Sequence, residues 1–304
     1  YFIFFILGSL GISDTFQLFW YLVIFIFGSY ISFFVFLKLI FEKISGAGKT
    51  LLSLFYSLNL YTLFVFSGNW GFSHYQCFYI FIPILFGLYI KFLETKKNVF
   101  GALFALVLFF ASPGFTNPAF ALSFGIIVFL LTSFFLLFGA AKLDRNMVTK
   151  ILILSAASFL VSAFWILPII PQMNAGVSGL FSGNALDLNL WISHNSNPIS
   201  RTLMLLNRTS DYFPYNFPYK SILFLKDFFI LISFLPAVFI FYSLSKLKSF
   251  KERNRKYFFI FLSLFILLVI LTAKVRPPFE NINFHIFNTW GLNTLRSWEK
   301  FFIH

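Results

Sequence analysis

The sequence predicts an all-α, polytopic integral membrane protein with about nine transmembrane helices, and composition and charge pattern support this fold class independently. The 304 residues are 59% hydrophobic and 11% charged, with a mean hydropathy of +0.86. Soluble domains carry about 25% charged residues, so a soluble fold of this length has no means of covering its apolar surface. Long runs of Phe, Leu and Ile alternate with polar connections, and most Lys and Arg residues fall in only four of these connections.

The apolar runs give the expected helices in order, since a span needs roughly 17–25 apolar residues. Run 1–7 is too short for a whole span, and we expect it to be the last part of one. Runs 78–90 and 99–111 are short, so we expect tilted or re-entrant segments, or helices that extend into their flanks. The prolines Pro83, Pro168, Pro171 and Pro236 interrupt or end apolar runs, and neighbouring helices usually accommodate such breaks. The other expected spans are 16–37, 51–66, 119–138, 151–170, 222–244 and 257–272.

The connections between these runs alternate in charge. Loops 8–15, 67–76 and 112–118 contain no Lys or Arg. Because basic loops stay in the cytoplasm, we expect the four basic connections to be cytoplasmic at the plasma membrane, and the longer segments 171–221 and 274–304 to face outward. This distribution explains the net charge of +13 without a nucleic-acid partner. The basic connections carry fifteen of the 23 Lys and Arg residues: Lys38, Lys43, Lys49, Lys91, Lys96, Lys97, Lys142, Arg145, Lys150, Lys246, Lys248, Lys251, Arg253, Arg255 and Lys256.

We interpret residues 1–304 as a single transmembrane domain and as a fragment of a longer chain, because the sequence begins without Met inside an apolar run. The single cysteine, Cys77, excludes an internal disulfide framework and a Cys-based zinc site. The four His residues have no metal-ligand spacing. We therefore predict no metal site and no cofactor, with a divalent-metal requirement left open.

The outward loop 171–221 combines aromatic and polar side chains that suit a sugar. Aromatic faces stack on the C–H surfaces of sugar rings, while amides and Arg bind hydroxyls. The alternative is an interfacial belt, because Trp and Tyr settle at the surface of a bilayer in any case. The candidates for sugar or acceptor binding are Trp191, His194, Arg201 and Asp211.

The outward segment 274–304 contains a stretch, 284–302, with large apolar residues three to five positions apart. This spacing predicts an amphipathic helix lying in the outer interface. Arg296 and Lys300 are four residues apart, so they share one face of that helix and can bind one anion together. The alternative is a pair of interfacial cations in contact with lipid headgroups.

Four short stretches, which together span most of the chain, resemble motifs of one known group of membrane proteins. YSLNLY at 56–61 resembles a Y-x-L-N-P-Y motif, with Leu60 in place of the usual Pro. IPIL at 82–85 and WILP at 165–168 resemble two further helices of the same group, the second of which precedes a large outer loop. RSWEKF at 296–301 is similar to an R-x-x-x-[KR]-F motif. In this order, the four stretches resemble the arabinofuranosyltransferases that build cell-wall arabinan and the related large membrane proteins of the YfhO type.

The resemblance implies a GT-C fold and a membrane glycosyltransferase that moves a sugar from a polyprenyl-phosphate donor to a cell-envelope glycan or lipid acceptor outside the cytoplasm. It implies an acidic catalytic base in the first outer loop, which by this comparison lies upstream of Tyr1. Within the chain, Asp14 is the substitute candidate. Arg296 and Lys300 suit the donor phosphate, because positive charge stabilises a departing phosphate. Membrane lipids are the other expected partners.

Two other classes stay open. A lipid or polysaccharide transporter usually carries ionisable residues near the middle of its spans, whereas here Lys38 and Lys226 lie close to the ends of their runs. A non-catalytic membrane subunit that helps assemble the cell envelope is the other alternative. It is favoured if the first outer loop of the complete protein lacks a carboxylate.

Overall fold

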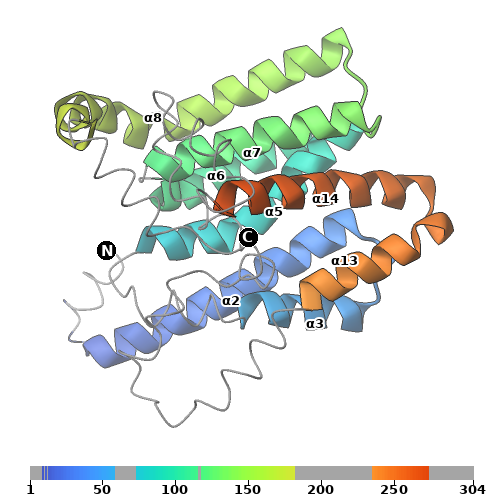
Figure 1. The fold of residues 1–304 in the computed structure, drawn as a ribbon. Helices are drawn as coiled ribbons and strands as arrows, with labels where there is room; N and C mark the ends of the chain where they lie inside the picture. Colours follow the sequence, from blue (N-terminus) through green and yellow to red (C-terminus); the bar gives the residue numbers. More distant parts are fainter. Residues whose placement is uncertain are drawn as a thin grey trace.

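Every element of the described chain is a helix, and no strand occurs in this part. The computed structural model describes residues 9, 11, 13–58, 73–115, 118–181 and 235–273. These residues confirm the all-α class. The elements, shown in Figure 1, are α2 (Asp14–Ile40), α3 (Gly46–Ser57), α5 (Ser73–Thr95), α6 (Asn98–Ala111), η1 (Ser112–Phe115), α7 (Pro118–Leu137), α8 (Arg145–Phe181), α13 (Leu235–Ser245), η4 (Leu247–Ser249) and α14 (Glu252–Ala273).

Four described helices are long and apolar enough to cross a membrane. The spanning stretches are Phe19–Ile40, Gln76–Thr95, Asn98–Phe115 and Arg145–Phe164. These helices indicate a membrane protein. The two short runs, 78–90 and 99–111, belong to helices that extend into their flanks, which was one of the expectations for them. The total of nine spans stays a prediction, because run 1–7 and parts of 51–66 and 222–244 lie outside the described residues.

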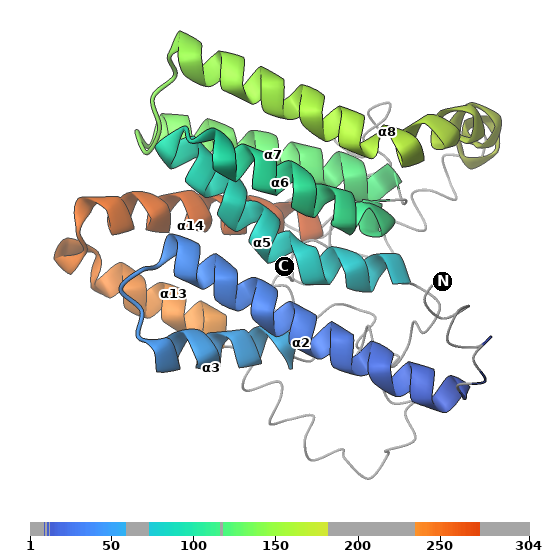
Figure 2. The ribbon, with the colours of Figure 1, turned by 180° about the vertical axis from the view of Figure 1, so that it is seen from behind.

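The helices lie side by side, and four of their connections meet at one end of the bundle. These are the connections 41–45, 96–97, 138–144 and 246–251, seen at the right of Figure 1 and at the left of Figure 2. We call this the basic end, because it carries the four Lys- and Arg-rich connections. Helix α5 lies centrally and contacts α2, α6, α7 and η1. Helix α3 packs on α2, α8 on α6, and α14 on α7.

The buried core is centred on α5. Close approach of α2 to α5 depends on glycine, because a Cβ at Gly87 would lie 3.3 Å from the Cα of Phe36, and one at Gly28 would lie 3.2 Å from the side chain of Ile80. Small residues at such contacts allow tight helix packing where no hydrophobic force drives association. The α5 residues in the largest core cluster are Phe78, Ile82, Leu85, Leu88, Tyr89, Ile90, Phe92 and Leu93.

Candidate functional site

Most of the predicted site residues lie outside the described part of the chain. Trp191, His194, Arg201 and Asp211 fall in 182–234, and Arg296 and Lys300 fall in 274–304. Their predicted roles stay predictions. Asp14 is the first residue of α2, a helix of 27 residues that reaches the basic end at Ile40. At 1.5 Å per residue, Asp14 therefore lies far from the basic end, at what we call the opposite end of the bundle.

Two stretches that carry the family resemblance meet inside the protein, at the proline of α5. Proline has no N–H, so Pro83 leaves the carbonyl of Tyr79 without its helical donor. The hydroxyl of Tyr56, from α3, donates to this carbonyl at 2.9 Å. The next amide, of Ile84, donates to Oγ of Ser32 on α2 at 3.2 Å. Neighbouring helices thus satisfy the backbone around Pro83, as its position in an apolar run predicts.

The contact between Tyr56 and Tyr79 is reciprocal. The hydroxyl of Tyr79 donates back to the carbonyl of Tyr56 at 2.6 Å, and the two rings stack with centroids 4.4 Å apart. Phe33 stacks on the other side of Tyr56, with centroids 4.5 Å apart. Both tyrosines are buried. Tyr56, the first residue of YSLNLY, therefore joins α3 to α5 and to α2.

A network of ion pairs links α5, α14 and the connection 41–45 at the basic end. Nζ of Lys91 lies 3.1 Å from Glu94 and 3.5 Å from Glu42. Arg253 of α14 contacts Glu94 with two nitrogens, Nε at 3.1 Å and Nη2 at 3.3 Å. The side chains of Lys91 and Glu94 are only 12% and 16% exposed, so water screens this pair less than a surface pair.

A second set of contacts ties α5 to α8 through Lys96. This residue has a φ of 54°, a left-handed conformation that glycine usually supplies after a helix. Its side chain pairs with Asp144, and its carbonyl accepts a hydrogen bond from Nζ of Lys150 at 2.6 Å. Asp144 also accepts from the amide of Met147 at 2.7 Å, at the start of α8. The ammonium of Lys96 and this amide hold the pKa of Asp144 below its usual value.

The four acidic residues of the basic end were not among the sequence-predicted site residues. A signal for them is present, because each lies within two residues of a cation of the four basic connections. Glu42 precedes Lys43, and Asp144 precedes Arg145. Only the fold shows that Glu42, Glu94 and Asp144 pair with cations from other connections, whereas Glu252 pairs with Lys256 on its own helix. The full set is Glu42, Glu94, Asp144 and Glu252.

Two buried polar side chains without partners lie toward the opposite end. Gln76, in the first turn of α5, is 2% exposed, and neither its Oε1 nor its Nε2 has a hydrogen-bond partner. Ser123, in the first half of α7, is 1% exposed, and its Oγ also has no partner. Burying a polar group without a hydrogen bond costs free energy. Sequence alone gave no reason to select either residue.

Within the described ranges, no group of three or more His, Cys, Asp or Glu side chains could hold a metal ion. No protein-family model, curated protein or solved structure matches the chain.

Proposed function

We propose that the protein is a membrane glycosyltransferase of the GT-C type. It would move a sugar from a polyprenyl-phosphate donor to a cell-envelope glycan or lipid acceptor on the extracytoplasmic face of the plasma membrane. In this proposal the basic end is cytoplasmic, and the reaction takes place at the opposite end.

The contact at Pro83 is the observation that supports the proposal most directly. The resemblance to arabinofuranosyltransferases rests on short motifs, two of which are YSLNLY at 56–61 and IPIL at 82–85. Their residues Tyr56 and Pro83 meet in space, since the hydroxyl of Tyr56 donates a hydrogen bond to the carbonyl of Tyr79, which Pro83 leaves without a helical donor. Two motifs that serve one packing arrangement are stronger support for a family resemblance than two unrelated matches.

The direction of the helices also supports the proposal. Helices α8 and α14 begin at the basic end, with Arg145 and Glu252, and run toward the opposite end. In the sequence, the sugar-binding candidates Trp191, His194, Arg201 and Asp211 follow α8, and the pair Arg296 and Lys300 follows α14. Gln76 lies toward the same end, and its unpartnered amide offers a donor and an acceptor for a sugar hydroxyl.

The proposed reaction assigns three roles. An outer carboxylate, upstream of Tyr1 or supplied by Asp14, takes the proton of the acceptor hydroxyl. The acceptor oxygen bonds to the anomeric carbon as the bond from that carbon to the phosphate oxygen breaks. Arg296 and Lys300 stabilise the negative charge on the departing polyprenyl phosphate. Trp191, His194, Arg201 and Asp211 position the sugar or the acceptor.

The variant Arg296→Ala in the full chain tests this assignment. Removing one donor that stabilises a transition-state charge lowers kcat by about 100-fold or more. We expect a loss of that size in sugar transfer from a polyprenyl-phosphate donor, measured in proteoliposomes. The matched control is Lys97→Ala, which removes a cation at the basic end and should leave transfer unchanged.

Equal turnover by Arg296→Ala and the unmodified protein would overturn the phosphate role. No transfer by the unmodified protein with any polyprenyl-phosphate sugar would instead favour the non-catalytic subunit. Ion-coupled transport has less support, because the charged residues in the described α5 and α14 lie near the basic end.

A further inference from the structure

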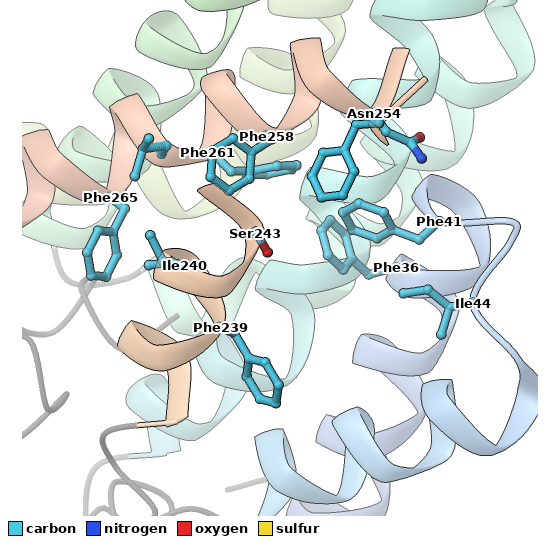
Figure 3. A pocket seen from close by; sticks show the side chains of 12 residues that line it. Phe36, Phe41, Ile44, Phe239, Ile240, Ser243, Asn254, Phe258, Phe261 and Phe265 are labelled. Atoms are coloured by element: carbon cyan, nitrogen blue, oxygen red, sulfur yellow. The ribbon is translucent and has the colours of Figure 1, made fainter. Parts of the chain in front are cut away.

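An apolar groove runs beside the basic end, between α2, α13 and α14. It has a volume of about 590 Å³, which lies within the range of about 300–1,000 Å³ found for small-molecule sites. Figure 3 shows side chains from these three helices around the same space. The lining residues are Phe36, Phe41, Ile44, Phe239, Ile240, Ser243, Phe250, Asn254, Phe258, Phe261, Leu262 and Phe265.

Polarity changes along this groove. Its two polar lining residues, Ser243 and Asn254, lie near the basic end, in the last turn of α13 and the first turn of α14. Helix α13 runs toward the basic end and α14 runs away from it, so Phe239 and Phe265 lie farther from the basic end than Ser243 and Asn254. The polar lining residues are therefore confined to the end of the groove near the basic end, whereas phenylalanines line its whole length.

Two lysines flank lining residues of the groove near the basic end. Lys43 lies in sequence between the lining residues Phe41 and Ile44, and Lys251 follows the lining residue Phe250. Within the described part of the chain neither lysine takes part in an ion pair, although the neighbouring Glu42 pairs with Lys91. A side-chain hydrogen bond with Lys251, and then the positive charge of Lys251, lower the pKa of Lys43.

We propose that this groove binds an anionic phospholipid, with its phosphate held by Lys43 and Lys251 and one acyl chain along the phenylalanines. Two like charges brought together without a carboxylate repel each other, and an anion between them removes this repulsion. The aromatic length of the groove gives a soluble phosphate nothing to bind, whereas it suits a hydrocarbon chain. Basic pockets between membrane helices are known to hold anionic headgroups.

This proposal does not depend on the glycosyltransferase assignment, because the groove is at the basic end and the reaction is assigned to the opposite end. A binding measurement that requires no sugar transfer can therefore test it. The probes are phosphatidylglycerol and phosphatidylcholine with identical acyl chains, together with glycerol phosphate as a headgroup without a tail. Binding to the full chain in neutral detergent is measured by native mass spectrometry.

The protein should bind phosphatidylglycerol more tightly than phosphatidylcholine and should not bind glycerol phosphate measurably. The double variant Lys43→Gln/Lys251→Gln should weaken phosphatidylglycerol binding by about 30-fold, the loss expected for two cations near an anionic surface. Its matched control, Lys97→Gln/Lys142→Gln, removes the same charge at the basic end. Neither of these residues lines the groove or flanks a lining residue as Lys43 and Lys251 do, so this control should retain the preference.

A second pair of variants tests the tail. Ser243→Trp places an indole in the groove and should reduce binding of both phospholipids. Phe241→Trp puts the same side chain at a position on α13 that is 70% exposed and outside the groove, and should change neither. Equal binding of the two phospholipids by the unmodified protein would overturn the proposal. A preference that survives Lys43→Gln/Lys251→Gln, or falls equally in its control, would also overturn it.

Discussion

Helices α5 and α8 are almost equally apolar, yet the fold uses them in opposite ways. The spanning stretches Gln76–Thr95 and Arg145–Phe164 have mean hydropathies of 1.7 and 1.9. The stretch in α5 is 67% buried inside the protein, whereas the stretch in α8 is only 17% buried. Hydropathy therefore identifies a helix that can cross a membrane, but it does not say whether that helix faces protein or lipid.

The difference between the two helices follows from their polar and small residues. In α5, Tyr79 contacts α3, Gly87 allows α2 to approach, and the hydroxyl of Tyr89 shares a hydrogen bond of 2.6 Å with Thr132 of α7. In α8, Leu152 and Leu160 are 64% and 72% exposed. Lipid is as apolar as leucine, so packing and hydrogen bonds, and not hydrophobicity, select the central helix.

Replacing one leucine in each helix should give the largest contrast. Leu85 of α5 is fully buried, whereas Leu160 of α8 is largely exposed. Leu85→Ala leaves a cavity and should lower the free energy of unfolding by about 2–5 kcal/mol. Leu160→Ala should change it by less than about 0.5 kcal/mol. Reversible unfolding of the protein in mixed micelles measures both values, and similar losses would mean that α8 is packed against protein.

The hydrogen bond beside Pro83 gives the next largest effect. Tyr56→Phe keeps the stacked ring but leaves the buried carbonyl of Tyr79 without a donor, which should cost about 1–3 kcal/mol of unfolding free energy. Tyr30→Phe is the control, because the Tyr30 hydroxyl makes only a contact of 3.4 Å with Thr50 at the exposed surface.

A double-mutant cycle makes this test specific. Pro83→Ala restores a helical N–H for the carbonyl of Tyr79, so Tyr56→Phe should cost less in the Pro83→Ala background than in the unmodified protein. Additive effects of the two substitutions in the same unfolding measurement would show that Tyr56 does not compensate for Pro83.

Replacing Gln76 of α5 should change the stability and the activity of the protein in opposite directions. Gln76→Leu removes two buried polar atoms that have no partner, so it should raise the unfolding free energy by about 1 kcal/mol. If the amide binds a sugar hydroxyl, the same variant should transfer sugar more slowly, as measured in the proteoliposome assay. A variant that is more stable and equally active would remove Gln76 from the proposed site. Ser123→Ala is the matched control, because it also removes an unpartnered buried atom.

The smallest expected effect concerns pH and the start of α8. Lys96 and the amide of Met147 depress the pKa of Asp144 in the folded protein. This interaction stabilises the fold above the unfolded-state pKa of about 4 and is lost as the pH falls through the folded value. Asp144→Asn should therefore flatten the decrease in unfolding temperature between about pH 5 and pH 3. Identical pH profiles for the variant and the unmodified protein would exclude this contribution.

Part of the fold was predictable from the sequence because it depends on properties of single segments. The apolar run 16–37 predicts α2 (Asp14–Ile40), and run 119–138 predicts α7 (Pro118–Leu137), since a span must be apolar along its length. The alternation of basic and uncharged loops predicts that the four basic connections share one side, and the fold gathers them at one end. The interpretation of Pro83 as a break accommodated by neighbouring helices is confirmed.

The candidate site was less predictable, and apart from Asp14 its described parts were those that the sequence did not reveal. Trp191, His194, Arg201, Asp211, Arg296 and Lys300 lie outside the described residues and stay predictions. Contacts between residues far apart in the chain bury the amide of Gln76 without a partner and bring Arg253 to Glu94.

The sequence by itself determined that the chain is helical, that it carries membrane-spanning runs and that its cations gather in alternate loops, because these are sums over neighbouring residues. Only the tertiary structure decided that α5 is central and α8 peripheral, that Tyr56 compensates for Pro83, and that Lys43 and Lys251 both flank lining residues of one apolar groove. In lipid, hydrophobicity exerts little force between helices, so short-range packing and hydrogen bonds choose the neighbours.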